Sequence, residues 1–455
     1  MKLILLSGGS GKRLWPLSND SRSKQFLKIL QNDSGKNVSM LQRVWEQLKQ
    51  CNLHNNSIIT TNQSQSEMIF NQIKDNVRLV IEPERRDTFP AIVLASLYLY
   101  EMEHISEDEI VVVLPVDPYV DPSFFRVVES LEGVLNETKA DLALIGVKPT
   151  YPSEKYGYIV PESGAMNSSC SSVKSFREKP DYENAKELVD QGALWNCGVF
   201  AFRLKYLFGI ISKREIPLDY EFVKSNYTML PKISFDYEVV ERAENIVVVP
   251  YTGYWKDLGT WNTLTEEMNN FVTGRGVLNE TALNTHIINE LDVPVVTLGI
   301  SNAIIAVSSD GILISDKEES QKIKDFVNGI NDRLMYEEKQ WGWYRVLDFT
   351  KYSGGEEVLI RRICISKGKN LSYHYHKKRT ELWTIVNGEA EIIIDSRIHH
   401  VKAGNVFQIL QGKKHAVRAL TDLEFIEVQR GEELSELDIY RLTMDWNQIQ
   451  TFVGL

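Results

Sequence analysis

Cysteine is scarce in this sequence. Four cysteines are spread over 455 residues, and no two have the spacing of a metal-binding pair: Cys51, Cys170, Cys197 and Cys364. So few and so widely spaced thiols argue against a disulfide framework. They predict reduced cysteines in a cytoplasmic protein.

Long hydrophobic runs are missing too. No apolar stretch approaches the roughly 18 residues that a membrane-spanning helix needs. The apolar run at residues 3–6 is too short for a signal peptide. The sequence therefore predicts a protein without a membrane partner.

An excess of positive charge is also absent. The chain has 51 Lys and Arg against 62 Asp and Glu, a net charge of −11, which argues against a general nucleic-acid binder. What remains is the composition of a globular protein, 43% hydrophobic and 25% charged. Because 455 residues exceed what one core usually holds, two or three domains are expected.

The N-terminal part of the chain, to about residue 260, alternates β-rich runs with helical patterns. Apolar residues three and four apart predict helices at 39–50 and 90–103. This alternation predicts an α/β fold, a parallel or mixed sheet with helices on both faces. Ligands of such sheets bind beyond the carboxyl ends of the strands. The predicted strands are residues 2–6, 57–60, 77–82, 110–116, 142–147, 198–202 and 246–251.

The pattern changes twice further along the chain. Short β segments at 293–316 and a helical pattern at 319–334 predict a small connecting β module. From about residue 340 the chain is nearly all short strands and glycine turns, which predicts a β-barrel, with an acidic helix or turn near 433–447. We expect domains at 1–275, 276–338 and 339–455.

A glycine loop follows the first predicted strand, in "LLSGGSGKRLWPL". Gly8, Gly9 and Gly11 allow backbone amides to approach a phosphate. The loop fits neither the dinucleotide fingerprint nor the Walker pattern, so side-chain cations must share the work. Residues 1–30 hold six Lys and Arg against one acid, which suits a polyanionic ligand. The alternatives are a tight turn and a solvated basic face.

An ordered set of motifs resembles one family. The set is "LLSGGSGKRLWPLS", "SKQFLKI", "IEPERRDTFPAI", "VLPVDPYV", "YPSEKYGYI", "FREKPD", "LWNCGVFAF" and "YWKDLGTW". Together they resemble the mannose-1-phosphate guanylyltransferases, within the sugar-nucleotide pyrophosphorylases, over about residues 1–335. The resemblance implies a Rossmann-like mixed sheet followed by a short left-handed β-helix-like connector.

The resemblance also implies how the triphosphate is held. Arg13 and Lys24 would meet the pyrophosphate end, and Asp117 and Asp257 would hold Mg²⁺ through oxygen ligands. Taken alone, each aspartate is better explained as a turn residue or a helix cap, and the ordered motif set reverses that preference. The residues expected at the nucleotide are Leu6, Gly8, Gly9, Gly11, Arg13, Lys24, Glu82, Arg86, Asp87 and Thr88.

The sugar side follows from the same resemblance. Lys179 would contact the sugar phosphate, Glu178 and Asn196 the hydroxyls, and Gly157 would let the backbone approach the ring. The alternatives are a surface ion pair for Glu178 and Lys179 and a turn for Asn196. Arg13, Lys24, Asp117, Lys179 and Asp257 form the expected catalytic set.

Two departures from the family pattern concern the nucleotide. Pro118 stands where relatives commonly have His, and Asp87 where they have Asn. Neither removes a charge or a metal ligand from the expected set. Both leave the nucleotide preference less firmly predicted than the reaction class.

Five of the eight histidines lie between 374 and 415. His374 and His376 alternate on a predicted strand and so share one face. With Glu381 and His415 they match a cupin motif, a ligand set that suits Zn²⁺, Fe²⁺, Mn²⁺ or Ni²⁺. His399 and His400 lie outside the pattern and are expected at the surface.

This last domain also resembles the type II phosphomannose isomerase cupin, over about 340–447. A metal there would polarise the sugar carbonyl during aldose–ketose proton transfer. Arg379 matches the family's basic residue. His374, Leu410 and Ala419 depart from the Gln, Pro and Asn usual at those positions. The alternative is a metal-stabilised structural cupin.

Taken together, these patterns predict that the chain makes GDP-mannose from GTP and mannose 1-phosphate, with a possible isomerase activity in the cupin. The alternatives are transfer to another sugar 1-phosphate or from another nucleotide, and an idle sugar-phosphate sensor or scaffold. GTP and mannose 1-phosphate are the expected partners, and a homo-oligomer is possible.

Overall fold

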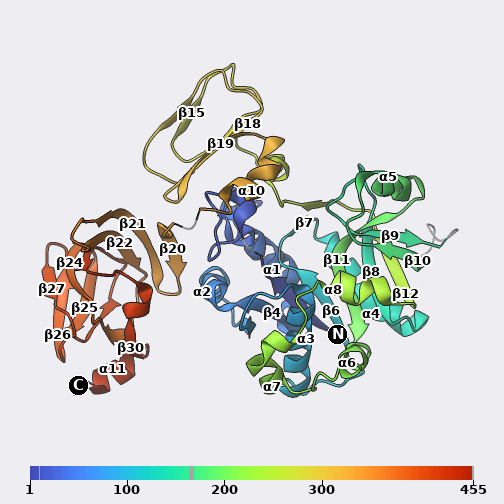
Figure 1. Cartoon of the computed structure of the whole chain (residues 1–455), viewed down its shortest axis with the longest axis horizontal. Coiled ribbons are helices and arrows are strands. Elements are labelled where there is room, and N and C mark those ends of the chain that lie inside the picture. The colour runs from blue at the N-terminus through green and yellow to red at the C-terminus, as the bar shows by residue number, and fades with distance from the viewer. Residues whose placement is uncertain (10, 163–168, 331, 453–455) are drawn as a thin grey trace. The chain divides into compact units, whose positions relative to one another are not determined.

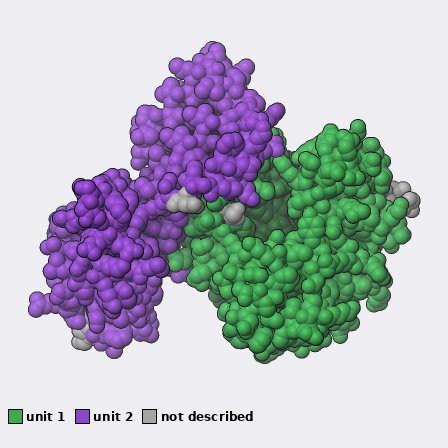
Figure 2. All heavy atoms as spheres, in the orientation of Figure 1, with its two compact units in different colours: residues 1–14, 18–270 green, residues 15–17, 271–455 purple. Residues whose placement is uncertain are grey.

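A computed structural model describes residues 1–9, 11–162, 169–330 and 332–452 (Figure 1). The chain divides into two compact units, which Figure 2 colours separately. The first unit contains residues 1–14 and 18–270, and the second contains 15–17 and 271–455.

The first unit is built on one nine-stranded sheet. Its strands run both parallel and antiparallel, so the predicted mixed sheet is confirmed. β1, which precedes the glycine loop, lies in the interior of the sheet with parallel partners on both sides. The strand order is β5 (Arg78–Glu82), β4 (Ser57–Asn62), β1 (Lys2–Ser7), β6 (Ile110–Pro115), β11 (Leu194–Arg203), β8 (Leu142–Val147), β12 (Ile246–Tyr251), β10 (Ser171–Arg177) and β9 (Tyr158–Pro161).

Helices cover both faces of this sheet and form two cores. Alternate residues of β1 face opposite ways: Leu3 and Leu5 enter one core and Ile4 the other. One core receives α1 (Met40–Gln50), α2 (Gln63–Gln72), α4 (Ser123–Thr138) and α5 (Tyr182–Asp190). The other receives α3 (Thr88–Glu101), α6 (Leu204–Ser212), α7 (Tyr220–Ser225) and α8 (Phe235–Glu238).

The second unit begins with a β-helix-like module. Its strands stack in parallel: β14 on β16, β16 on β18, and β15 on β17. Trp15 belongs to this unit and fills the space beside Gly311, where a Cβ would come within 2.4 Å of the indole. The strands are β14 (Val272–Thr273), β15 (Gly276–Leu278), β16 (His286–Asn289), β17 (Val295–Thr297), β18 (Ala303–Ser308) and β19 (Gly311–Asp316).

The helix predicted at 319–334 is much shorter in the structure. A 3-10 turn (Glu319–Lys322) leads into α10 (Ile323–Val327), and the helix ends there. Asn328 and Gly329 follow directly, and this dipeptide favours a turn over further helix. The prediction was wrong for residues 328–330 and 332–334, and residue 331 lies outside the described residues.

The remainder of the second unit is a two-sheet β-barrel, as predicted, around its own core. One sheet contains β20 (Tyr336–Lys339), β21 (Gly342–Lys351), β22 (Glu357–Ile365), β29 (Leu423–Gly431), β24 (Arg379–Asn387) and β27 (Val406–Ile409). The other contains β26 (Arg397–Lys402), β25 (Glu389–Ile394), β28 (His415–Ala419), β23 (Tyr373–Tyr375) and β30 (Tyr440–Thr443).

The acidic helix or turn expected near 433–447 is only partly present. A single 3-10 turn (Glu436–Asp438) is followed by β30, and α11 (Trp446–Phe452) comes after it. β30 pairs with β23 at the edge of the second sheet, and the hydrogen bonds of this pairing outweigh the local preference for a helix. Among the described residues, no helix combines the length and the hydrophobicity needed to cross a membrane.

Candidate active site and metal centre

The glycine loop leaves the carboxyl end of β1 and depends on its glycines. Gly11 has φ of 63°, and a Cβ there would lie 2.2 Å from the backbone oxygen of Asn19. Gly9 also has a positive φ, of 136°. Both conformations favour glycine. At Gly11, any other residue would also force the backbone to move, because its Cβ would collide with Asn19.

Two predicted metal ligands meet around a lysine at the same edge of the sheet. β7 (Pro118–Val120) pairs with β13 (Trp255–Asp257), which brings Asp257 beside the turn that holds Asp117. Lys24 Nζ lies 3.0 Å from Asp117 Oδ2 and 2.8 Å from Asp257 Oδ1. One cation thus bridges both carboxylates, so their oxygens are already spaced to share a positive charge.

The electrostatics of this triad favour its charged form. Burial alone would lower the pKa of Lys24, but Asp117 and Asp257 outweigh it and raise that pKa. Burial would raise the pKa of Asp257, and the ammonium of Lys24 reverses this and lowers it. Hard oxygen donors of this kind suit a divalent cation such as Mg²⁺.

A cavity of about 190 Å³ is lined by expected catalytic residues from both the nucleotide side and the sugar side. Arg13, Lys179 and Asp257 all line it. The sequence reasoning missed further lining residues, although four of them belong to the quoted "YPSEKYGYI" segment: Tyr151, Glu154, Lys155, Tyr156, Thr260 and Thr263. Burial, with Arg13 nearby, lowers the pKa of Lys155.

The predicted base-side residues are held by different partners. Glu82 ends β5 and accepts a hydrogen bond from the Tyr227 hydroxyl at 2.8 Å. Arg86 donates to the carbonyl of Leu230 at 3.0 Å, and Asp87 caps α3 through the Thr88 amide at 2.7 Å. Leu6 pairs with neighbouring strands and packs against the core.

The predicted sugar-side residues form one cluster. A Cβ at Gly157 would lie 2.5 Å from Glu178 Oε2 and 3.4 Å from the Asn196 Cβ, so this glycine provides the space that both occupy. Lys179 Nζ pairs with Glu178 at 2.5 Å. Asn196 donates through Nδ2 to Asp236 Oδ1 at 2.7 Å, a carboxylate that no sequence motif indicated.

The three predicted cupin histidines meet inside the barrel. His374 and His376 come from the β23 segment, and His415 lies opposite His374 on β28. All three are buried, and one ring nitrogen of each lies within 4.8 Å of the others. Of the described residues, this is the group that can hold a metal ion through three or more such side chains.

The tautomer of each ring is fixed from outside the cluster. Because a carbonyl oxygen only accepts, each Nδ1 must donate, so each Nε2 carries a lone pair that can bind a metal. The Nε2 of His376 lies 3.4 Å from Arg379 Nη2. Burial and the other two histidines lower the pKa of His374 well below its usual value, so its ring is neutral. The three contacts are His374 to Ser372 O at 2.8 Å, His376 to Asp438 O at 2.7 Å and His415 to Lys413 O at 2.9 Å.

Glu381 completes the set at a short distance. Its Oε1 lies 3.1 Å from His376 Nε2 and its Oε2 lies 3.5 Å from His415 Nε2. His415 Nε2 is buried and makes no hydrogen bond to the described residues. A buried imidazole nitrogen without a hydrogen bond, beside a carboxylate, is a ready ligand, so these residues fit a divalent transition metal. Of the two histidines outside the set, His400 is exposed, as expected, and His399 is half-buried.

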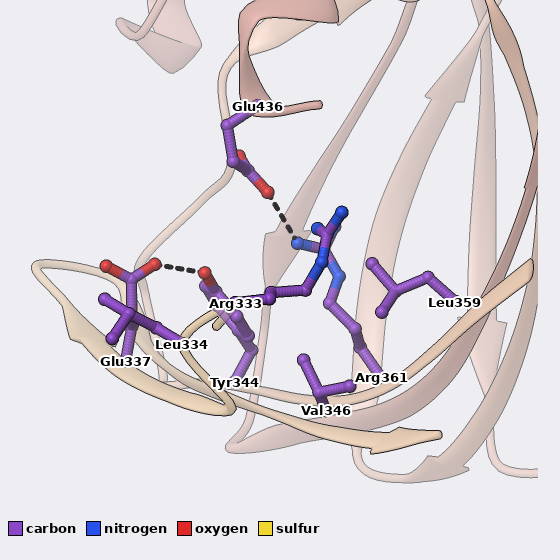
Figure 3. A pocket seen from close by; sticks show the side chains of 8 residues that line it. All are labelled: Arg333, Leu334, Glu337, Tyr344, Val346, Leu359, Arg361 and Glu436. Atoms are coloured by element: carbon purple, nitrogen blue, oxygen red, sulfur yellow. Dashed lines mark hydrogen bonds and ion pairs between the residues drawn. The ribbon is translucent and has the colours of Figure 1, made fainter. Parts of the chain in front are cut away.

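A second cavity, of about 240 Å³, lies in the barrel and is drawn in Figure 3. Arg361 lines it and donates to Glu436 at 2.9 Å (Figure 3). Arg361 also donates to Glu427 at 2.6 Å. Trp383 Nε1 donates to both Glu427 and Glu381, at 3.2 and 3.1 Å. The cavity is therefore linked to the metal ligands by a continuous buried polar network, which the sequence reasoning did not predict.

Comparisons with known proteins agree with this geometry. The nucleotidyl transferase family model matches residues 2–274, and the model of the mannose-6-phosphate isomerase C-terminal domain matches residues 332–444. Among curated relatives, the mannose-1-phosphate guanylyltransferase RfbM of Salmonella typhimurium is 30% identical, with 96% of each chain covered. The xanthan biosynthesis protein XanB of Xanthomonas campestris is 29% identical over 96% of this chain and 97% of its own.

One solved structure also resembles most of the chain. It is named a mannose-1-phosphate geranyltransferase and comes from Thermus thermophilus. It is 30% identical with a TM-score of 0.61, and covers 73% of this chain and 99% of its own.

Proposed function

The chain belongs to the nucleotidyl transferase family, and from that premise we propose that it transfers GMP from GTP to α-D-mannose 1-phosphate, releasing diphosphate. The observation that carries this proposal is the 190 Å³ cavity. Three residues with different expected roles line this cavity. Arg13 is expected at the leaving pyrophosphate, Lys179 at the sugar phosphate, and Asp257 at the metal ion.

The reaction needs charge placement more than a protein nucleophile. An oxygen of the sugar phosphate attacks the α-phosphorus of GTP, a new P–O bond forms, and the bond to the bridging oxygen of the β-phosphate breaks. Lys179 holds the attacking phosphate. Arg13 and the amides of the glycine loop hold the leaving end. Fixing two polyanions in line supplies much of the rate.

Asp117 and Asp257 are the residues that would hold Mg²⁺. The ion would supply charge neutralisation on the phosphates during transfer. Lys24 bridges both carboxylates, which supports a cation site there. With a metal in place, Lys24 would turn to the phosphates of GTP.

The base and the sugar are bound on either side of this centre. Glu82 offers a carboxylate to the N1–H and 2-amino donors of guanine, the base with that donor pair on its pairing edge. Glu178 and Asn196 offer acceptors and an amide to the hexose hydroxyls. Another sugar 1-phosphate or another nucleotide is the alternative substrate, and an idle sensor or scaffold is the alternative function.

The test of the transfer site is a pair of substitutions. Asp117→Ala and Asp257→Ala should each reduce diphosphate release by about a hundredfold or more at saturating Mg²⁺, because each removes a metal ligand. Asp190→Ala, at the exposed end of α5, is the matched control and should release diphosphate at the wild-type rate. Near-normal turnover in either folded site variant would contradict the metal assignment.

A second function is favoured by the histidine cluster. We propose that His374, His376, Glu381 and His415 hold Zn²⁺, Fe²⁺, Mn²⁺ or Ni²⁺, and that the cupin interconverts mannose 6-phosphate and fructose 6-phosphate. The ion would polarise the sugar carbonyl. The 240 Å³ cavity carries both guanidinium and carboxylate groups, which can bind the phosphate and the hydroxyls of a sugar phosphate. A purely structural metal is the alternative.

The remaining assignments are part of the same proposal. Residues 1–275 would carry the transfer, 276–338 the connection and 339–455 the metal chemistry. The partners would be GTP and mannose 1-phosphate in the cytoplasm. A homo-oligomer stays a prediction.

A further inference from the structure

Asp236 lies inside the sugar-side cluster, although no motif in the sequence indicated it. It follows Phe235 in α8, and its carboxylate accepts from Asn196 Nδ2 at 2.7 Å. We propose that Asp236 is a specificity-determining residue of the sugar subsite, whose carboxylate hydrogen-bonds a hydroxyl of the hexose 1-phosphate and fixes the amide of Asn196 beside it. This inference rests on the proposed transfer to a sugar 1-phosphate.

The chemistry around Asp236 is that of a polyol site. Glu178, with a side chain only 6% exposed, and Lys179 are close enough to interact electrostatically with it. Two carboxylates and an amide offer several acceptors to vicinal hydroxyls, while Lys179 supplies the positive charge for the attached phosphate. A structural ion pair would need one acid; this cluster has two acids for one lysine.

The amide of Asn196 is oriented by the same contacts. Its Nδ2 donates to Asp236, and its Oδ1 accepts from the amide of Gly198 at 3.0 Å. Both ends of the side chain are therefore committed to fixed directions. A sugar arriving here meets a rigid amide, which gives geometric selectivity among hexoses.

The close approach of two acids has a measurable consequence. Burial, and then the neighbouring Glu178, raise the pKa of Asp236 to about 7. Lys179 also faces it and works against the increase.

α8 is anchored so that Asp236 is held in place. The Phe235 amide donates to Thr88 Oγ1 at 2.8 Å, and in the 3-10 turn that follows α8 (Val240–Arg242) the carboxylate of Glu241 accepts from the Glu178 amide at 2.9 Å. Phe235 itself is fully buried in the core. The segment 235–241 therefore contacts Thr88, a predicted nucleotide residue, and Glu178, a predicted sugar residue. A displacement of the Asp236 carboxylate should change sugar binding.

The experiment measures KM for both substrates in Asp236→Asn. This change keeps the size of the side chain and an acceptor for Asn196 but removes the charge. The KM for mannose 1-phosphate should rise about tenfold or more, as for loss of a charge-assisted hydrogen bond, and the KM for GTP should stay within about twofold. Asp219→Asn is the matched control: it caps α7 through the Phe222 amide on the surface and should leave both constants unchanged. Asp236→Glu, which keeps the charge but displaces it, is measured alongside in case one variant folds poorly.

A series of 2-, 3-, 4- and 6-deoxy mannose 1-phosphates separates contact from mere support. For the analogue that lacks the hydroxyl read by Asp236, wild type and Asp236→Asn should have the same KM, while the others keep the penalty. An equal penalty on every analogue, or an unchanged KM for mannose 1-phosphate, would overturn the inference. If the wild-type protein uses neither mannose 1-phosphate nor any of its deoxy analogues with GTP, the proposed function is contradicted instead.

Discussion

At the scale of single residues, Lys24 has the most informative position. The sequence predicts it at the pyrophosphate, and in the structure its Nζ bridges the two carboxylates proposed for Mg²⁺. An ammonium and a divalent ion cannot share that position. If the proposed Mg²⁺ site is correct, Lys24 would compete with the metal until the phosphates of GTP offer it another partner.

This competition gives a prediction about metal binding without nucleotide. Lys24→Gln should bind Mn²⁺ about tenfold or more tightly than wild type, because two carboxylates lose their internal cation. Titration followed by electron paramagnetic resonance measures this directly. Lys36→Gln, an exposed lysine elsewhere in the same unit, should bind as wild type does. Equal or weaker Mn²⁺ binding in Lys24→Gln would show that the lysine does not guard the site.

Glu82 gives a prediction about pH. Burial raises its pKa to about 7, although the hydrogen bond from Tyr227 favours the ionised form. The ionised carboxylate is the better acceptor for guanine, and it becomes scarce below pH 7. The KM for GTP should therefore fall as pH rises from 6 to 8.

The matched variant for this pH profile is Glu82→Gln. Its amide does not titrate, so any slope that remains belongs to other groups, the phosphates of GTP among them. Subtracting that slope from the wild-type profile should leave a transition near pH 7. Superimposable profiles would remove Glu82 from the base site.

At the scale of elements, the glycine loop depends most on one position. At Gly11 a side chain meets both a positive φ and the backbone oxygen of Asn19. Gly11→Ala should cost about 1–3 kcal/mol locally and raise the KM for GTP, because the loop must move. Gly133→Ala, in open space on α4, should leave the KM unchanged and slightly raise the melting temperature. An unaltered KM for GTP in folded Gly11→Ala would show that the loop does not hold the triphosphate.

The same scale shows how far sequence patterns reach. Strands such as β6 and β8 and helix α1 were predictable, because hydrophobic period and caps agree with the tertiary contacts. The helix at 319–334 and the segment near 433–447 were not, because an Asn-Gly pair and an edge strand outweigh a weak helical period. Asp236 was missed for a related reason: it reaches Asn196 only when two segments forty residues apart meet.

The candidate sites follow the same rule. His374 and His376 were predictable from local spacing, since alternation on a strand fixes a common face, and His415 was predictable only through the resemblance to the cupin motif. The network of Arg361, Glu427 and Trp383 was not, because it depends on side chains from three different strands. Motif spacing finds residues that act within one element, and contacts between elements need coordinates.

At the scale of the whole molecule, the two proposed chemistries are assigned to separate units. The carboxylate site lies in the first unit and the histidine site in the second. His376→Ala combined with His415→Ala should remove the transition metal, measured by elemental analysis, and abolish hexose 6-phosphate interconversion while guanylyl transfer persists. Interconversion by the folded, metal-free variant would rule out the histidine site. Failure of the metal-loaded wild type to isomerise would favour a structural cupin.

Product analysis tests the proposed transfer itself. Wild-type protein with Mg²⁺ is incubated with each of the four nucleoside triphosphates and a panel of sugar 1-phosphates, and both diphosphate and the sugar nucleotide are measured. We predict that GTP with α-D-mannose 1-phosphate gives the highest kcat/KM and that GDP-mannose and diphosphate form in equal amounts. A higher kcat/KM with another pair, or no diphosphate from any pair, would contradict the proposed function.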